Sequence, residues 1–348
     1  MKVKIDRSLR ERPVKKLLII GNHLLGDSIA TLHLLFSLKK HFHHTSFHLL
    51  TSNYSREVYE KMGIFDEILC YNKKQKSPTV NFHRFGFLKL LRIINRINAD
   101  LVIILPTNFI FAFISFILRI PRRLGFSKGM QKFFLTGHMP LYKKMPNEEN
   151  YRSILRCFPY HIRERNYYYK PGKYRIRLSK PYFSVAPCAT DKKKEWAEDN
   201  FITVIKFLQR EYNLKTIILG LKSDKDKLDR IAKATGSLNL AGKTTTDEAF
   251  FHINKSAFFL GNDSGLAQVA ANMSVLTVIL LGPTDPVQGR PWGKRVVMIY
   301  NEKNKKRKKN NTAVKKSKIT DLSVNKVIDV LANNRFFRRN LKFPKHKH

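Results

Sequence analysis

A carboxylate lies in a glycine-flanked turn near the start of the chain, directly after a short apolar run. The turn Gly21-Asn-His-Leu-Leu-Gly26-Asp27-Ser28 has the spacing of a phosphate-binding P-loop, but Asp27 occupies the position of the lysine. That motif requires a cation beside the phosphates, which a carboxylate would repel. Residue 23 is histidine, so the turn also lacks the G-x-G-x-x-G pattern of dinucleotide-binding proteins. Asp27 is therefore either a general base or the N-cap of the next helix, and spacing alone does not decide between them.

A second glycine-flanked turn, Gly261-Asn-Asp-Ser-Gly265, separates an apolar run from a helix expected over Leu266–Asn272. The start of a helix offers free backbone N–H groups and the positive end of a dipole, which suits a diphosphate. The alternative is that Asp263 or Ser264 only caps the helix. Small residues on both sides indicate close approach of the backbone to a ligand and favour the binding site.

Two more turns follow apolar runs. Lysines 192–194 lie in the segment from Ala189 to Trp196. Either they belong to a solvated loop, or one of them reaches a phosphate as a point charge. The turn from Gly282 to Pro286 contains two prolines and is either part of a site or a structural turn that only ends the strand.

The elements that position these turns follow an α/β pattern, because short apolar runs alternate with longer segments of helical periodicity. Open parallel sheets bind ligands at the carboxyl ends of their strands, where these turns fall. We predict a Rossmann-like doubly wound domain over residues 1–170 and another over 181–320, meeting at a cleft, with a helix and basic tail over 321–348. The expected strands are Lys16–Ile20, Phe47–Thr51, Asp66–Tyr71, Leu101–Leu105, Tyr182–Ala186, Thr216–Leu219, Ser256–Leu260 and Leu276–Leu281.

The chain is strongly basic, since 66 Lys and Arg against 26 Asp and Glu give a formal charge of +40 over 348 residues. Such a charge attracts nucleic acid, anionic lipid or phosphorylated glycans without selecting among them. The densest clusters are Lys303–Lys318 and the tail from Arg335, and each is either a solvated surface or a polyanion contact. The chain shows no zinc-finger or RRM signature. Because 43% of the residues are apolar, global disorder is excluded.

One segment, Leu101–Ile120, is long and apolar enough to be compared with a membrane span. Pro106, Thr107 and Asn108 interrupt it, so we expect a strand, a turn and a buried helix. The phenylalanines at 109, 111, 113 and 116 leave room for contact with a bilayer surface. The apolar run Leu17–Ile20 is too short for a secretory signal.

The three cysteines, Cys70, Cys157 and Cys188, lie far apart and are odd in number. They fit neither a disulfide framework nor a zinc pattern. We therefore expect them in a reducing cytoplasm.

Five motifs together resemble glycosyltransferase family 9, the bacterial ADP-heptose:lipopolysaccharide heptosyltransferases and their relatives. They occur in the family's order and at its intervals, over most of residues 16–293. The motifs are GNHLLGDSIATL from Gly21, KEW at 194–196, NLAGKTT from Asn239, GNDSGLAQVAA from Gly261 and LLGPTDP from Leu280.

The resemblance implies a GT-B fold, an α/β architecture of two Rossmann-like domains facing across a cleft, and an inverting enzyme that needs no metal and no cofactor. It implies that the N-terminal domain binds the acceptor and the C-terminal domain binds the nucleotide sugar. Asp27 matches the family's catalytic base, and Lys194 matches the lysine that neutralises the leaving diphosphate. Asp263, Ser264 and Gly265 match the D-[ST]-G that holds the donor. Asp224 lies near the acidic position that contacts the ribose, in a loosely aligned stretch.

The chain departs from the family pattern at two positions. Gln268 replaces the histidine of D-[ST]-G-x-x-H, which removes a potential cation near the phosphates but keeps a hydrogen-bond donor. We expect this change to alter affinity or donor preference. His33 replaces a proline in the first helix, and both changes indicate a divergent branch.

The leading hypothesis is a glycosyltransferase that moves a sugar, with ADP-linked heptose favoured, onto a lipopolysaccharide core or a related lipid-linked saccharide. It would act in the cytoplasm, peripheral to the anionic cytoplasmic face of the inner membrane, and no specific nucleic acid is expected as a partner. The alternative is a non-catalytic nucleic-acid or anionic-surface binder on a GT-B scaffold, which the charge and Gln268 favour.

Overall fold

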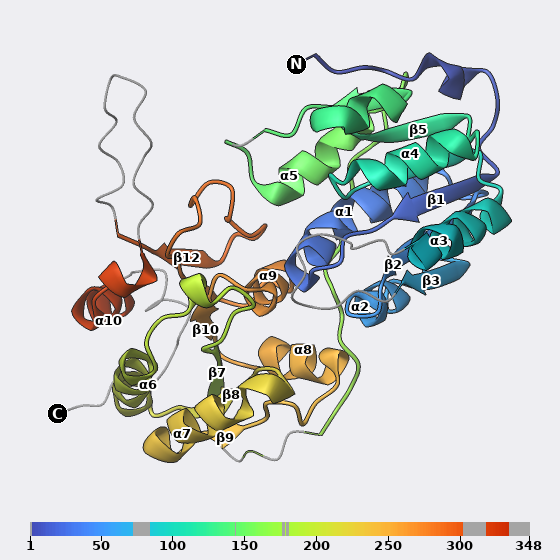
Figure 1. Cartoon of the computed structure of the whole chain (residues 1–348). Coiled ribbons are helices and arrows are strands. Elements are labelled where there is room, and N and C mark those ends of the chain that lie inside the picture. The colour runs from blue at the N-terminus through green and yellow to red at the C-terminus, as the bar shows by residue number, and fades with distance from the viewer. Residues whose placement is uncertain are drawn as a thin grey trace, which may run out of the picture. The chain divides into compact units, whose positions relative to one another are not determined.

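The computed structural model describes residues 2–71, 84–142, 144–175, 178, 181–301 and 318–333. The basic cluster predicted at 303–318, apart from its last residue, and the tail from Arg335 lie outside these residues. The chain divides into two compact units, Met1–Tyr167 and Tyr168–His348 (Figure 1).

Unit 1 contains a six-stranded parallel sheet with the order β3-β2-β1-β4-β5-β6. Helices α3 and α4 bury their apolar side chains against one face of the sheet, beside residues such as Leu18, Ile20 and Val102. The elements of this unit are η1 (Arg7–Arg10), β1 (Lys16–Ile20), α1 (Leu25–His41), β2 (Ser46–Ser52), α2 (Arg56–Glu60), β3 (Glu67–Tyr71), α3 (Arg84–Ile97), β4 (Leu101–Ile104), α4 (Phe109–Ile117), β5 (Arg122–Phe126), η2 (Gly129–Phe134), β6 (Gly137–Met139), α5 (Asn147–Arg152) and η3 (Ser153–Cys157).

Unit 2 repeats this plan, with a parallel sheet in the order β12-β11-β10-β7-β8-β9. Its elements are β7 (Tyr182–Ala186), η4 (Lys192–Lys194), α6 (Glu198–Tyr212), β8 (Lys215–Ile218), η5 (Lys222–Asp224), α7 (Lys225–Thr235), β9 (Leu238–Asn239), α8 (Thr246–Asn254), β10 (Phe259–Asn262), α9 (Gly265–Asn272), β11 (Thr277–Leu280), β12 (Val296–Ile299), η7 (Ile319–Asp321) and α10 (Val324–Asn333).

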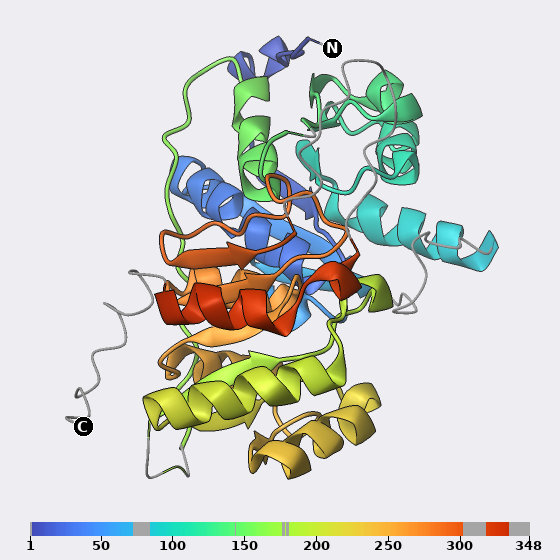
Figure 2. The ribbon, with the colours of Figure 1, turned by 90° about the vertical axis from the view of Figure 1, so that its left-hand side faces the viewer.

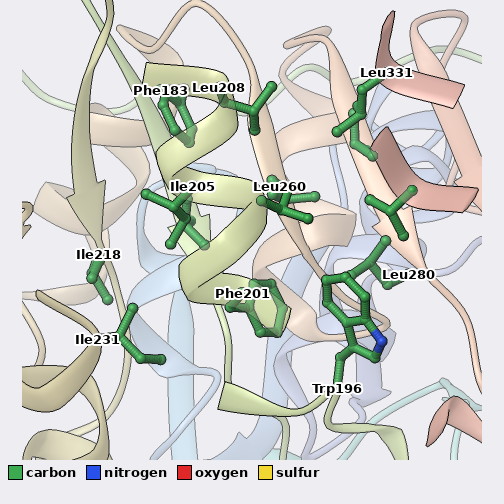
Figure 3. Close-up of a cluster of buried hydrophobic side chains, with 14 of the residues drawn as sticks. Phe183, Trp196, Phe201, Ile205, Leu208, Ile218, Ile231, Leu260, Leu280 and Leu331 are labelled. Carbon is green, nitrogen blue, oxygen red and sulfur yellow. The ribbon is translucent and has the colours of Figure 1, made fainter. Parts of the chain in front are cut away.

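The core of unit 2 follows from the alternation of side chains along its strands. In β7, Phe183 and Val185 point to the face that α6, α7 and α10 cover (Figures 2 and 3). Tyr182 and Ala186 point to the opposite face, where α8 and α9 pack. The strands are buried on both faces, as is usual for parallel sheets.

Each sheet, counted within its own unit, has the doubly wound order 3-2-1-4-5-6. The chain leaves β1 and β4, and likewise β7 and β10, on opposite sides of the sheet, so a crevice forms beyond the carboxyl ends of these neighbouring strands. The prediction of an α/β, doubly wound architecture is confirmed.

Two local predictions need correction. The strand expected at Ser256–Leu260 is β10 at Phe259–Asn262, so it begins later and continues through Gly261. A Cβ at Gly261 would lie 2.9 Å from the carbonyl oxygen of Ala186 on the neighbouring strand β7. This glycine therefore serves strand packing, whereas the sequence suggested the approach of a ligand. The last helix begins at Val324 and is preceded by the short η7.

The apolar segment 101–120 forms β4, a turn and α4, as predicted. Within the described residues, no helix is both long enough and apolar enough to span a bilayer.

Candidate functional site

In unit 1, Asp27 lies at the crevice beyond β1 and β4. Helix α1 begins at Leu25 with Leu24 as its N-cap, so Asp27 is in the first turn and the N-cap interpretation is wrong. A carboxylate in the first turn interacts favourably with the helix dipole. Asp27 lines a pocket of about 250 Å³ together with Asn22, His23 and residues 105–108 of the loop that follows β4.

The loop between β1 and α1 is held by side chains from the end of β2. Thr51 Oγ1 donates to the carbonyl of Asn22 at 2.9 Å, and Ser52 Oγ donates to the carbonyl of His23 at 3.1 Å. Gly21 begins this loop in a tight space, because a Cβ there would lie 3.1 Å from Leu49 Cδ1 and that side chain would have to shift. These contacts fix the backbone that leads to Asp27.

Tyr151 of α5 is largely buried and lines the same pocket, where its hydroxyl interacts with Asp27. Burial, and then the negative charge of Asp27, raise the pKa of Tyr151 well above its ordinary value. The hydroxyl therefore keeps its proton beside the carboxylate. The sequence did not predict Tyr151, because no motif surrounds it.

In unit 2, three loops bring their side chains together at the carboxyl ends of β7, β10 and β11. Lys194 Nζ lies 2.7 Å from Asp263 Oδ2, and Thr284 Oγ1 donates to the same oxygen at 2.6 Å. The turn from Gly282 to Pro286, for which the sequence left two interpretations, thus contributes Thr284 to this group. Lys194 and Asp263 are each only partly exposed.

Ser264 and Gly265 form the start of α9 beside this ion pair. Ser264 is the N-cap residue, but its side chain makes no capping hydrogen bond. Its Oγ is buried and has no hydrogen-bond partner among the described residues. An unsatisfied hydroxyl next to free helix N–H groups fits an anionic ligand. One turn further, Gln268 Nε2 donates to the carbonyl of Gly289 at 3.4 Å, which ties α9 to the loop after β11.

Asn262 holds the lysine loop in place. Its buried amide accepts a hydrogen bond from the backbone N–H of Trp196 at 3.1 Å and donates to the carbonyl of Pro187 at 2.6 Å. Trp196 is itself buried, and its indole N–H donates to the carbonyl of Leu322 at 2.8 Å. The segment that carries Lys194 is therefore fixed both to β10 and to the end of η7. The sequence did not predict a role for Asn262, although this residue lies within the motif that begins at Gly261.

Asp224 belongs to a separate charged group in the same unit. Its carboxylate lies 3.5 Å from Lys192 Nζ, which also contacts Glu195 at 2.9 Å. Burial acts to raise the pKa of Glu195, but hydrogen bonds from the backbone N–H of Ala189, Lys192 and Lys227 outweigh it and leave the pKa below its ordinary value. The structure thus joins Lys194, Asp263 and Ser264, and it places Asp224 in a neighbouring cluster that shares the loop 189–196.

A family model described as glycosyltransferase family 9 (heptosyltransferase) matches residues 87–318, more than half of the chain. The chain belongs to this family. Membership confirms the resemblance drawn from the five motifs, identifies the protein as a glycosyltransferase, and favours the enzyme over a non-catalytic binder.

Relatives within and around the family support this assignment. Lipooligosaccharide heptosyltransferase 2 of Haemophilus ducreyi is 24% identical over 82% of this chain and 88% of its own length. A shorter stretch, 34% of this chain and 36% of the relative, is 29% identical to lipopolysaccharide heptosyltransferase 3 of Escherichia coli.

Solved structures show the same fold. A family 9 glycosyltransferase from Veillonella parvula superposes with a TM-score of 0.76 at 18% identity, over 93% of this chain and 97% of that one. The E. coli ADP-heptose lps heptosyltransferase II gives a TM-score of 0.72 at 19% identity, over 93% and 99%. The GT-B fold class of this glycosyltransferase is thereby confirmed.

Proposed function

We propose that this glycosyltransferase transfers heptose from ADP-heptose to a lipopolysaccharide core or a related lipid-linked saccharide, with inversion at the anomeric carbon and without a metal. In this proposal unit 2 binds the donor and unit 1 binds the acceptor. The observation that carries it is the group of Lys194, Asp263 and the unsatisfied Ser264 hydroxyl at the start of α9. The names of the relatives, which include an ADP-heptose enzyme, support the choice of donor.

The donor group has the chemistry that a departing diphosphate requires. As the bond from the anomeric carbon to the diphosphate breaks, negative charge grows on the phosphate oxygens. The ammonium of Lys194, the N–H groups at Gly265 and the Ser264 hydroxyl stabilise that charge without a rearrangement of solvent. Asp263 holds Lys194 before the donor binds. Gln268 offers an amide in place of the family's histidine, and Asp224 is proposed to contact the ribose.

The acceptor group supplies a base. In the proposed reaction Asp27 takes the proton of the acceptor hydroxyl while that oxygen forms its bond to the anomeric carbon. Tyr151 is not a base here, because its raised pKa keeps it protonated. Its role is to orient the carboxylate of Asp27.

The proposed acceptor is anchored in a membrane, so we place the enzyme in the cytoplasm, peripheral to the cytoplasmic face of the inner membrane. The formal charge of +40 would favour such an anionic surface. No specific nucleic acid is part of the proposal.

The first test is a calorimetric titration of the protein with ADP, UDP, GDP and CDP at one fixed ionic strength. All four carry the same diphosphate, so differences in their affinities report recognition of the base, separately from the electrostatic attraction of any anion to a basic protein. We expect ADP to bind most tightly and transfer to follow when ADP-heptose and an acceptor are added. Selectivity for another base would contradict the proposed donor. Equal, salt-sensitive binding of all four would contradict the donor site itself.

A further inference from the structure

Five apolar side chains are exposed on α4 and η2 in unit 1. We call them the α4–η2 patch: Phe109, Phe116, Ile117, Met130 and Phe133. Phe133 is 72% exposed and Met130 is 59% exposed, which is unusual for side chains of this size. The sequence suggested a bilayer contact through the phenylalanines of α4 alone, but Phe111 is buried and the 3-10 helix η2 supplies the most exposed members.

The two elements of the patch are neighbours, because they pack on each other. The ring of Phe134 lies 5.3 Å from that of Phe113 and 5.6 Å from that of Phe116. Gln131 is fully buried and donates to the carbonyl of Pro106 at 3.3 Å. The neighbouring side chains of η2 are thus anchored, and its two most apolar exposed residues remain in solvent.

Cations surround the patch, and acidic residues are absent from this stretch of sequence. Lys132 Nζ lies 4.8 Å from the centre of the Phe133 ring, and the guanidinium of Arg123 lies 5.5 Å from that of Phe116. Arg119 and Lys128 are also exposed. Residues 101–146 contain no Asp or Glu. Arg122 also lies in this stretch, but it is buried and bonded to backbone carbonyls, so it takes no part in the patch.

The patch adjoins the pocket of Asp27. Asn108 lines that pocket, and its side chain caps α4 by accepting from the N–H of Ile110 at 3.0 Å. Phe109 follows at once, so the loop that forms one wall of the pocket continues directly into the patch. An acceptor held by lipid at the patch would have its saccharide near the carboxylate.

We propose that the α4–η2 patch docks on the surface of an anionic phospholipid bilayer. The apolar side chains enter the boundary between headgroups and acyl chains, and the surrounding cations contact lipid phosphates. Apolar insertion and charge act as two combined signals, each too weak alone for stable binding. The inference rests on the proposed function, in which the acceptor is lipid-linked.

The test separates insertion from the attraction of a basic chain. We would measure co-sedimentation of the full chain with vesicles of phosphatidylcholine and phosphatidylglycerol at about 0.15 M salt and again at about 0.5 M, where exposed charges are strongly screened. Met130→Ser/Phe133→Ser should lower the partition coefficient at least about tenfold at high salt, because apolar insertion carries the remaining affinity. The matched control is Ile5→Ser/Leu238→Ser, which removes two exposed apolar side chains elsewhere and should bind as the parent does.

Two further measurements decide the outcome. Phe133→Trp should show fluorescence quenched by brominated lipid, and Met130→Ser/Phe133→Ser should keep its turnover on a delipidated, water-soluble acceptor while losing turnover on a vesicle-bound one. Parental vesicle binding of the double variant, or an equal loss in the control, would overturn the proposal. So would a change from dimer to monomer without a change in partitioning, because the patch would then join two copies of the chain. Failure of transfer on every acceptor, with insertion intact, would instead overturn the proposed function.

Discussion

The ammonium group of Lys194 is bound to the carboxylate of Asp263, with 2.7 Å between Nζ and Oδ2, although the two residues are 69 positions apart in the chain. The lysine proposed to meet the departing diphosphate is thus already held in position, at the start of α9. The donor does not have to order a flexible side chain, which lowers the entropic cost of binding.

Loss of this cation should affect the chemical step most. We expect Lys194→Ala to lower kcat by about 10²–10³, the range found when one preorganised stabiliser of developing charge is removed. ADP affinity should fall less. Lys193→Ala is the control, because this neighbouring lysine is exposed and should leave kcat unchanged. Comparable losses in both variants would mean that only the local charge matters.

Removal of the proposed base should leave donor binding intact. Asp27→Asn is expected to lower kcat by about 10²–10⁴, because the amide cannot accept the acceptor's proton. Calorimetry should give the parental ADP affinity. The control is Glu11→Gln, which removes an exposed carboxylate from the same unit. Parental turnover of Asp27→Asn would refute its role.

Tyr151 should not titrate in the working range of the enzyme, and a pH profile would show it. Burial, and then the charge of Asp27, raise its pKa well above the ordinary value, so its hydroxyl stays neutral. Tyr151→Phe should therefore lower kcat without moving the alkaline limb of kcat/KM. An alkaline limb that moves or disappears in this variant would mean that the tyrosine itself acts as an acid or a base, and thermal unfolding would report a purely structural loss.

Asn262 should couple stability to donor binding. Asn262→Ala leaves the N–H of Trp196 and the carbonyl of Pro187 without their buried partner, which costs about 2–4 kcal/mol. We expect a lower free energy of unfolding in urea and weaker ADP binding, because the Lys194 loop loses its anchor. Asn254→Ala, at the exposed end of α8, should change neither.

The buried His33 should make the free energy of unfolding depend on pH. Burial, and then the charge of Arg152, lower its pKa from 6.5 to about 3, and its Nδ1 accepts the N–H of Tyr167 at 2.8 Å. At a pH between these two pKa values, His33 is protonated in the unfolded chain and neutral in the folded chain. The free energy of unfolding therefore falls as the pH drops below about 6.5. The loss from this residue should be about 2 kcal/mol between pH 7 and pH 5.

His33→Asn keeps an acceptor near Nδ1 and cannot titrate, so its unfolding free energy should depend less on pH. His161→Asn, at an exposed histidine, should retain the full dependence. Identical pH profiles for the parent and His33→Asn would exclude the effect.

Sequence patterns predicted β1 and β7 to the residue, because each is a short, mostly apolar segment that ends at a turn. They missed β5, whose first residue is Arg122. This arginine is buried, and its guanidinium donates to the carbonyls of Asp100 and Arg12, which a hydropathy pattern cannot reveal. Tyr151 and Asp27 are 124 positions apart in the chain, so only the folded structure shows that they interact.

The end of unit 2 supports the donor group from outside it. Asn301 donates to the carbonyl of Asp321 at 3.3 Å, and Lys326 donates to that of Tyr300 at 2.8 Å. These contacts join residues 300–301, which follow β12, to the segment that contains η7 and α10. In that segment the carbonyl of Leu322 accepts the indole N–H of Trp196. A substitution that displaces η7 should therefore reach the loop of Lys194 through Trp196 and weaken donor binding, although η7 lies outside every motif that the sequence shares with the family.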